Sequence, residues 1–469
     1  MKKLALILSS LIVCSSIVAQ TLLTINDREI SKQEFEYYYK KNNHIESDTL
    51  SAEAYMEMFI NFKLKVEEAY ALKYDTASSF SEELNAYRAP LAAAYLTDSV
   101  KMKELEKEAY NNLLKDVYVS HILFRADSEN DSIALEKALA AKKRSKKTDF
   151  NKLALEVSED PSVVYNEGIL GWTTGMTMVY PFEKAAFSLK KGKISEPIKT
   201  SFGYHLIKVH KTRPTRGEVQ VAHIFKRIPE GADSAQIDAI RKEMHRIHGV
   251  LKNGGEFEDL VKAHSEDKNT KKGGILPYWV STGQTNDLFE DAAFALKYPG
   301  DFSEVVEAPY GFHIIQLIDK HEKPDYNRWM PQIQTRMRMD ERASLIKESF
   351  INKTRKEYKL ADSLTDVEVL QYADANLEKK YPEFGYLMQE YRDGILLFNI
   401  SKDMVWDKAS KDEAKLKEIY EQGNYDKPYN KVRGIVISQY QDTLEQEWIN
   451  ALREKYTIKV NQDILKTIK

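Results

Sequence analysis

Two stretches of the chain, roughly a hundred residues apart, share one pattern of apolar and polar positions. Each has a glycine, an aromatic residue, a histidine and then a run of branched apolar residues: SFGYHLIKV at 201–209 and PYGFHIIQL at 309–317. Short runs of β-branched residues that follow a glycine turn are typical of strands. The pattern therefore predicts two equivalent strands, each with a histidine near its beginning.

The match between the two stretches extends over the residues that precede them. VSHILFRA (119–126) corresponds to VAHIFKRI (221–228), FNKLALEVSED (150–160) to FEDLVKAHSED (257–267), and FEKAAFSLKKGKIS (182–195) to FEDAAFALKYPGDFS (289–303). Two copies of this length are too few and too long for a solenoid of short repeats. We expect two tandem domains, at 117–213 and 218–322, with KTRPTRGE as the linker between them.

Within each copy the hydrophobic period alternates between that of strands and that of helices. A strand with the first histidine is followed by a charged helical stretch (132–146 or 234–252) and by a second helix that begins at Phe150 or Phe257. A glycine-rich segment, a short helix and the final strand complete each copy. This alternation predicts an α+β domain.

The regions that flank the copies, 20–116 and 323–469, are predicted to be mainly helical. Apolar residues recur there at helical spacing, in the stripes Phe59, Phe62, Val66, Ala69; Phe80, Leu84, Tyr87, Leu91, Tyr95; and Phe384, Leu387, Met388, Tyr391, Ile395, Phe398. Most such stripes are expected to be core. TLLTINDREIS predicts a strand and turn, and the final REKYTIKVNQDIL predicts a helix and a strand that returns to pair with 22–25. The expected fold class is therefore multidomain α+β.

The first residues predict a targeting segment. Two lysines precede an apolar run at 4–13, and Ala19 offers a cleavage site before the next residue. The run is too short to cross a membrane, so we interpret 1–19 as a secretory signal peptide, with a retained anchor as the alternative. The bulky Val13 beside Cys14 disfavours a lipoprotein signal. We expect an exported protein with no transmembrane segment after cleavage and no lipid anchor on Cys14.

Charge and residue content disfavour several functional classes. The 69 basic and 72 acidic residues give a net charge of −3, so nucleic acid is not an expected partner. The single cysteine leaves with the signal peptide, which removes disulfides, thiol nucleophiles and zinc–thiolate sites. The copies lack a serine on a sharp turn with a matching base, closely spaced zinc ligands, and the lysine of a phosphate loop. No metal or cofactor is expected.

The first copy combines motifs that resemble a known family. SHIL, SEDPS, GILGW and MVYPFEKAAFSLKKGKISEPIKTSFGYHLIKVH together resemble the parvulin peptidyl-prolyl cis-trans isomerases, over about a hundred residues in each copy. With the export signal and the helical flanks, the whole chain resembles the periplasmic chaperone-isomerases of the SurA type. The resemblance implies a periplasmic location and unfolded or proline-containing exported polypeptides as partners, outer-membrane protein precursors among them.

The resemblance also implies roles for single residues, each of which would otherwise be read as ordinary core. The implied catalytic residues are the paired histidines His121 and His205, their hydroxyl partner Thr200, and Asp160, which faces the substrate peptide bond. The implied walls of the proline pocket are Leu170, Met178 and Phe182. Rotation about an X–Pro bond breaks no covalent bond. We therefore expect the histidines to orient a hydrogen-bond network rather than to transfer a proton.

The second copy departs from this pattern. It keeps the counterparts His223, Asp267, Phe289 and His313. However, Thr285 replaces the pocket methionine, Ala308 replaces the threonine, and Pro277 stands where the family prefers glycine. We expect this copy to be a weak isomerase or a peptide-binding spacer.

Three functions are left open by the sequence. The first is an exported peptidyl-prolyl isomerase that also assists folding. The second is a holdase chaperone, in which the tyrosine-rich helical flanks hold unfolded chains and isomerase activity is dispensable. The third is a secreted scaffold without activity.

Overall fold

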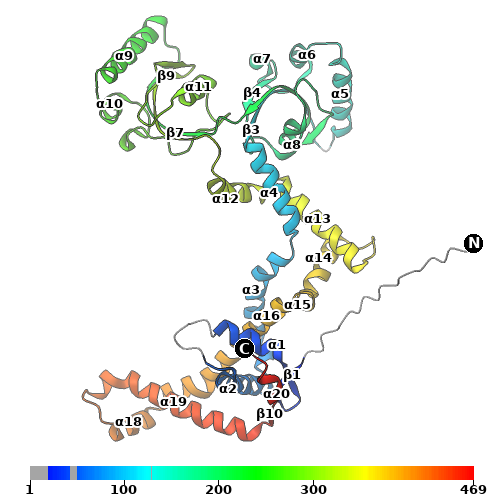
Figure 1. Cartoon of the computed structure of the whole chain (residues 1–469), viewed down its shortest axis with the longest axis vertical. Coiled ribbons are helices and arrows are strands. Elements are labelled where there is room, and N and C mark those ends of the chain that lie inside the picture. The colour runs from blue at the N-terminus through cyan, green and yellow to red at the C-terminus, as the bar shows by residue number, and fades with distance from the viewer. Residues whose placement is uncertain (1–19, 43–49, 128, 469) are drawn as a thin grey trace, which may run out of the picture. The chain divides into compact units, whose positions relative to one another are not determined.

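The computed structural model describes residues 20–42, 50–127 and 129–468 (Figure 1). The predicted signal peptide at 1–19, with Cys14, lies outside the described residues. Contacts divide the chain into two units: residues 98–353 form one, and the residues before 98 form the other together with those from 354 onward. The former contains both copies of the repeated sequence and is named the repeat unit; the latter is named the helical unit.

A small sheet joins the two ends of the chain in the helical unit. β1 (Thr21–Ile25) pairs antiparallel with β2 (Arg28–Ser31) on one side and with β10 (Ile458–Val460) on the other. Leu23 of β1 lies opposite Val460. The predicted return of the last strand to the first is therefore confirmed.

Helices make up the rest of the helical unit. They are α1 (Lys32–Asn42), α2 (Ala52–Ala71), a 3₁₀ turn (Tyr74–Thr76), α3 (Ser78–Tyr95), α14 (Asp366–Ala375), α15 (Leu377–Lys380), α16 (Pro382–Ser401), a π-helical turn (Lys402–Trp406), α17 (Asp407–Lys411), α18 (Glu413–Gln422), α19 (Tyr429–Lys455) and α20 (Gln462–Leu465). Phe59, Phe80 and Phe384 of the predicted stripes are buried core residues. Tyr87 and Phe398 are not, because 44% and 57% of their surface is exposed.

The first repeat is a four-stranded antiparallel sheet with helices on both faces. Its elements are β3 (Lys115–Arg125), α5 (Asp131–Arg144), α6 (Phe150–Val157), α7 (Val163–Asn166), β4 (Ile169–Thr173), α8 (Tyr180–Ser188), β5 (Ile198–Thr200) and β6 (Gly203–Pro214), with sheet order β4-β3-β6-β5. Successive strand residues point to opposite faces. Ile122 and Leu206 therefore pack with α5 and α6, whereas Val119 and Ile207 pack with α8.

The second repeat has the same order of elements but one strand fewer. Its elements are β7 (Glu218–Arg227), α9 (Ser234–Lys252), α10 (Phe257–His264), a 3₁₀ turn (Thr270–Lys272), α11 (Asp287–Ala295), β8 (Val306–Ala308) and β9 (Gly311–His321), with sheet order β7-β9-β8. In the described stretch that corresponds to β4, only Ile275 and Val280 form isolated bridges. Pro277 stands there and has no N–H to donate to a ladder.

Two details differ from the sequence-based expectation. β6 continues to Pro214 and β7 begins at Glu218, so only 215–217 connect the repeats and most of KTRPTRGE belongs to strands. The boundary expected at 116 also shifts, because α4 (Ser99–Leu113) belongs to the repeat unit.

Three helices outside the repeats contribute to the repeat unit. They are α4, α12 (Tyr326–Met337) and the first part of α13 (Glu341–Tyr358). One apolar cluster joins α4 and α12 to the first repeat, through Leu105, Leu113, Met176, Tyr180, Ile333 and Met337. In the part of the chain that the structure describes, none of the helices has the length and apolar character needed to cross a membrane.

Candidate functional site

Two buried histidines lie side by side on neighbouring strands of the first repeat. His121 on β3 is opposite Ile207, and His205 on β6 is opposite Leu123, so both side chains leave the sheet on the face that α8 covers. Their ring centroids are 5.5 Å apart and their Nδ1 atoms 3.2 Å apart. The antiparallel register therefore brings together two residues that are 84 positions apart in the sequence.

Four side chains form one hydrogen-bonded chain. Thr200 Oγ1 is 2.8 Å from His205 Nε2. At the other end, His121 Nε2 is 2.7 Å from Asp160 Oδ2. An ionised carboxylate can only accept, so His121 donates from Nε2 and accepts at Nδ1 from His205 Nδ1. His205 Nε2 then accepts from the Thr200 hydroxyl, whose oxygen accepts from the Phe202 N–H at 3.1 Å. One set of neutral tautomers satisfies every member.

Burial keeps both imidazoles neutral at neutral pH. Desolvation, assisted by the neighbouring His121, lowers the pKa of His205 to about 4. Desolvation also lowers the pKa of His121, although Asp160 acts in the opposite direction. For Asp160 itself, burial acts to raise the pKa, but hydrogen bonds from Ser162 and His121 lower it below its usual value. A neutral, fully hydrogen-bonded pair beside a fixed carboxylate is suited to orientation and less to proton transfer.

An apolar cleft of about 470 Å³ adjoins this chain. Leu170, Met178 and Phe182 line it together with Asp160 and both histidines. The Phe182 ring meets both imidazoles edge-on, with centroids 6.0 Å from His121 and 5.4 Å from His205. Thr200 is buried behind His205 and does not line the cleft. The structure therefore brings all seven residues singled out in the first copy to one site.

Several lining residues were not identified from the sequence. They are Leu123, Arg125, Pro161, Thr177, Val179, Phe202 and Arg336. All except Arg336 lie next to motif residues in the sequence, so their position in the motifs was a signal that could have identified them. Arg336 lies on α12, far along the chain and outside both repeats. No pattern in the sequence connects α12 with this cleft.

The second repeat has the same histidine geometry but an incomplete chain. His223 Nδ1 and His313 Nδ1 are again 3.2 Å apart. His223 Nε2 is 3.4 Å from Asp267 Oδ2, a longer distance than in the first repeat. Because Ala308 has no hydroxyl, His313 Nε2 is buried without a hydrogen-bond partner among the described residues. Burial and the neighbouring His223 lower the pKa of His313 to about 3.

The second cleft is smaller and differs in its walls. Its volume is about 390 Å³, and Asp267, Phe289 and both histidines line it. Thr285 lines it in place of the methionine, with its hydroxyl buried and unpaired among the described residues. The Phe225 ring stacks on His313 at 4.8 Å and occupies the position of Leu123 in the first repeat. The second cleft therefore lacks the flexible apolar side chain that Met178 gives the first, and it has an additional aromatic ring, that of Phe225.

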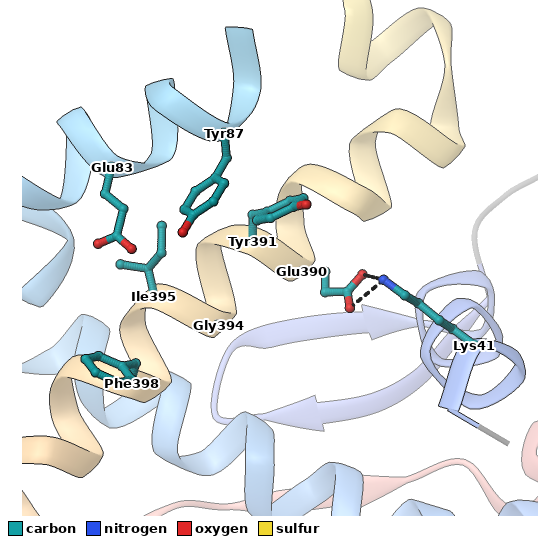
Figure 2. Close-up of a pocket in the computed structure, with 8 residues that line it drawn as sticks. All are labelled: Lys41, Glu83, Tyr87, Glu390, Tyr391, Gly394, Ile395 and Phe398. Atoms are coloured by element: carbon teal, nitrogen blue, oxygen red, sulfur yellow. Dashed lines mark hydrogen bonds and ion pairs between the residues drawn. The ribbon is translucent and has the colours of Figure 1, made fainter. Parts of the chain in front are cut away.

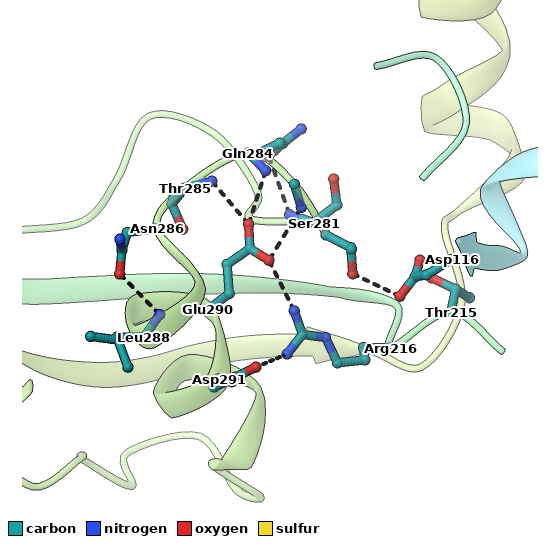
Figure 3. Close-up of polar contacts among 12 residues, drawn as sticks. Asp116, Thr215, Arg216, Ser281, Gln284, Thr285, Asn286, Leu288, Glu290 and Asp291 are labelled. Carbon is teal, nitrogen blue, oxygen red and sulfur yellow. Dashed lines mark hydrogen bonds and ion pairs between the residues drawn. The ribbon is translucent and has the colours of Figure 1, made fainter. Parts of the chain in front are cut away.

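A buried glutamate on α8 of the first repeat, and on α11 of the second, accepts hydrogen bonds from the loop that precedes the helix. An arginine from outside the repeat pairs with each glutamate. In the first repeat, Glu183 accepts from the Met176 N–H at 2.7 Å and pairs with Arg342 of α13 at 2.8 Å. In the second, Glu290 pairs with Arg216 of the connecting segment at 2.9 Å, as Figure 3 shows. Glu290 also accepts from the backbone N–H groups of Gly283, Gln284 and Thr285.

The helical unit contains a separate groove, named the α16 groove. Two adjoining cavities of about 560 and 380 Å³ share Glu390 and Gly394 of α16. Their other lining residues are Tyr38, Lys41, Asn42, Tyr55, Met58, Phe59, Phe62, Glu83, Tyr87, Tyr391, Ile395 and Phe398. Figure 2 shows Tyr87 of α3 facing Tyr391 of α16, with ring centroids 4.9 Å apart. The groove is therefore rich in aromatic residues and partly open to solvent.

Comparison with known proteins gives matches to both repeats. Residues 121–211 and 223–319 match the rotamase family, described as the PPIC-type PPIase domain. Chaperone SurA of Nitrosospira multiformis is 32% identical over 215 residues, which are 43% of this chain and 47% of the relative. Foldase protein PrsA of Geobacillus kaustophilus is 31% identical over 209 residues, which are 42% of this chain and 70% of the relative.

The coverage of these relatives is partial. The chain spans about half the length of the first SurA relative and 60% of that from Methylobacillus flagellatus, to which it is 27% identical. Among solved structures, the parvulin of Nitrosopumilus maritimus is 38% identical, with 21% of this chain and 97% of that chain covered and a TM-score of 0.17.

Proposed function

We propose that this chain, which belongs to the PPIC-type peptidyl-prolyl cis-trans isomerase (rotamase) family, accelerates cis–trans isomerisation of X–Pro bonds in unfolded exported polypeptides. The observation that carries the proposal is the first repeat's cleft, where Leu170, Met178 and Phe182 adjoin a complete hydrogen-bonded chain. A predicted signal peptide at 1–19 supports export to the periplasm, where precursors of outer-membrane proteins are the proposed clients.

The geometry suits a reaction without covalent catalysis. The X–Pro bond rotates over a barrier of about 18–20 kcal/mol because amide resonance is lost in the twisted state. Leu170, Met178 and Phe182 supply apolar surface that holds the prolyl ring while the preceding carbonyl turns. Each buried methylene contributes only about 0.8 kcal/mol, so substrate binding is weak and tolerant of sequence.

The polar chain contributes by being fixed before the substrate arrives. Both oxygens of Asp160 are engaged, Oδ2 by His121 and Oδ1 by Ser162. A carboxylate held in this way offers a constant electrostatic environment as the amide twists, without reorganising during the reaction. Thr200, His205 and His121 act on the substrate through the position that they give to Asp160 and Phe182.

The test is the isomerisation rate of a proline tetrapeptide with the full-length chain. The expected result is a faster rate of isomerisation that saturates only at high peptide concentration, because the cleft binds mainly the prolyl ring and affinity is low. An isomerisation rate equal to the spontaneous one contradicts the proposal.

The α16 groove favours a second function, holding unfolded chains. Gly394 lies on its floor in the middle of α16, and a Cβ added there would meet no atom within 4 Å. A glycine inside a helix is about 0.5–1 kcal/mol less stable than alanine. Packing within the chain does not require a glycine here. We therefore attribute its presence to the groove, which a larger side chain at this position would partly fill. The proposed occupants are apolar and aromatic side chains of unfolded clients.

Replacing Gly394 by leucine is expected to weaken client binding about tenfold, because the new side chain fills the groove. The measurement is fluorescence anisotropy of a labelled, permanently unfolded polypeptide titrated with the full-length chain. Gly434 of α19 is the matched control, since it is also an exposed glycine inside a helix of the same unit with open space at its Cβ position. Equal affinities of the Gly394→Leu and Gly434→Leu variants contradict a client site in the groove.

A further inference from the structure

The first repeat's cleft includes one residue from outside the rotamase family domain. Arg336 lies on α12, beyond both stretches that match the family. It lines the cleft with Met178 and Phe182. The second cleft has no such contribution, because its described lining residues all lie between His223 and His313. This one difference between the two clefts therefore comes from α12, in addition to the differences in their walls.

Packing fixes the position of Arg336. Its guanidinium donates to the backbone carbonyls of Met176 and of Met178, the latter at 3.3 Å. On the same helix, Ile333 and Met337 are buried in the cluster shared with the first repeat. These hydrogen bonds among the described residues use two of the five N–H groups of the guanidinium. The others can donate to an acceptor in the cleft.

The charged residues around the cleft favour an anionic ligand group. Among the described residues that line it, two carry a guanidinium group, Arg125 and Arg336, and one carries a carboxylate, Asp160. Asp160 is already engaged by His121 and Ser162. A planar guanidinium matches a carboxylate in shape and charge and can bind both of its oxygens.

We propose that Arg336 is a specificity-determining residue of the first repeat, and that it binds the carboxylate of an aspartate or glutamate next to the proline of the client. This inference rests on the proposed isomerase function and specifies its substrate class. The prolyl ring fills the apolar wall at Leu170, Met178 and Phe182, and the neighbouring acidic side chain reaches Arg336. The described lining of the second cleft includes Arg227 but no residue of α12, and we expect the second repeat to lack this preference.

The experiment compares kcat/KM of the full-length chain for proline peptides with glutamate, glutamine or lysine before the proline, and for a second series with the same residues after it. We expect glutamate to exceed glutamine by about three- to fivefold in one series, a size typical of a partly exposed ion pair. Arg336→Gln should reduce this ratio to about one, and Arg336→Lys should retain part of it. Arg338→Gln is the control, because Arg338 is exposed and lines neither cleft.

The outcomes separate a specificity role from a structural one. If Arg336→Gln lowers kcat/KM equally for all peptides, Arg336 only positions the loop through the two carbonyls and the inference is wrong. It is also wrong if Arg125→Gln removes the glutamate preference while Arg336→Gln leaves it. Acceleration of all peptides without any charge preference contradicts this inference alone, whereas no acceleration of any peptide contradicts the proposed function as well.

Discussion

Replacing Asp160 by alanine in the full-length chain is expected to lower kcat/KM for X–Pro isomerisation by at least about tenfold. Asp160 is the acceptor that fixes the tautomers of His121 and, through it, of His205. A hydrogen bond to a charged group contributes about 1.5–3 kcal/mol, and each 1.36 kcal/mol changes a rate tenfold. The measurement is the isomerisation rate of a proline tetrapeptide, with circular dichroism to establish that the variant is folded.

The matched variant is Asp267→Ala in the second repeat, for which we expect a loss of less than about twofold. The second chain of hydrogen bonds is already incomplete, because His313 Nε2 is unpaired among the described residues and Asp267 lies 3.4 Å from His223. A buried polar group without a partner costs about 1–3 kcal/mol. Similar losses in the two variants would show that both repeats contribute equally, contrary to the ranking proposed here.

The sequence placed His121 and His205 on predicted strands, and the family resemblance implied that the two histidines form a pair. Two strands with the same apolar run, one at each end of a repeat, place His121 and His205 on one face once they pair. The same regularity made the pairing of β10 with β1 predictable. Local patterns of period two predicted these strands, whereas the pairing of the two histidines also required the family resemblance.

The arginines that bind the loops before α8 and α11, or the glutamates of these helices, could not be predicted in this way. Arg342 and Arg336 lie on helices outside the repeats, and Arg216 lies in the connecting segment. Tertiary packing decides which residues these arginines contact. From the sequence alone, an arginine at each of these positions is expected to be exposed to solvent. The sequence grouped α4 with the N-terminal region for the same reason, whereas in the structure its apolar face packs on Met176 and Tyr180.

Replacing Arg342 by methionine is expected to lower the free energy of unfolding of the repeat unit by about 3–5 kcal/mol at neutral pH, the usual cost of leaving a buried charge without its partner. Arg342 and Glu183 are 1% and 0% exposed, and their side chains are 2.8 Å apart. Burial already raises the pKa of Glu183 although Arg342 opposes this change. Chemical denaturation of the full-length chain, followed by tryptophan fluorescence, measures the loss.

Two further variants identify the unpaired carboxylate as the cause. Arg216→Met should cost less than Arg342→Met, because Glu290 retains three backbone N–H donors, whereas Glu183 retains one backbone N–H and the Asn112 amide. The double variant Glu183→Gln/Arg342→Met should recover most of the lost stability, because it removes the buried charge as well as its partner. Failure of the double variant to recover would assign the loss to the other contacts of Arg342, which are its ion pair with Asp340 at 2.6 Å and its packing on Tyr180, whose ring centroid lies 4.1 Å from the guanidinium carbon.

The stability deficit of Arg342→Met should also depend on pH in a defined direction. Loss of the cation raises the folded-state pKa of Glu183 further above its ordinary value of 4.5, so the folded variant binds more protons than the unfolded chain between these two values. Stability then falls as pH rises through that interval, and the deficit is smaller at about pH 5 than at about pH 7.

Because Glu183 accepts from the Met176 N–H, the same variant should loosen the segment that carries Met178 and lose isomerase activity in parallel. If the stability deficit is the same at about pH 5 and about pH 7 and activity is retained, the Glu183–Arg342 ion pair does not control the geometry of the cleft.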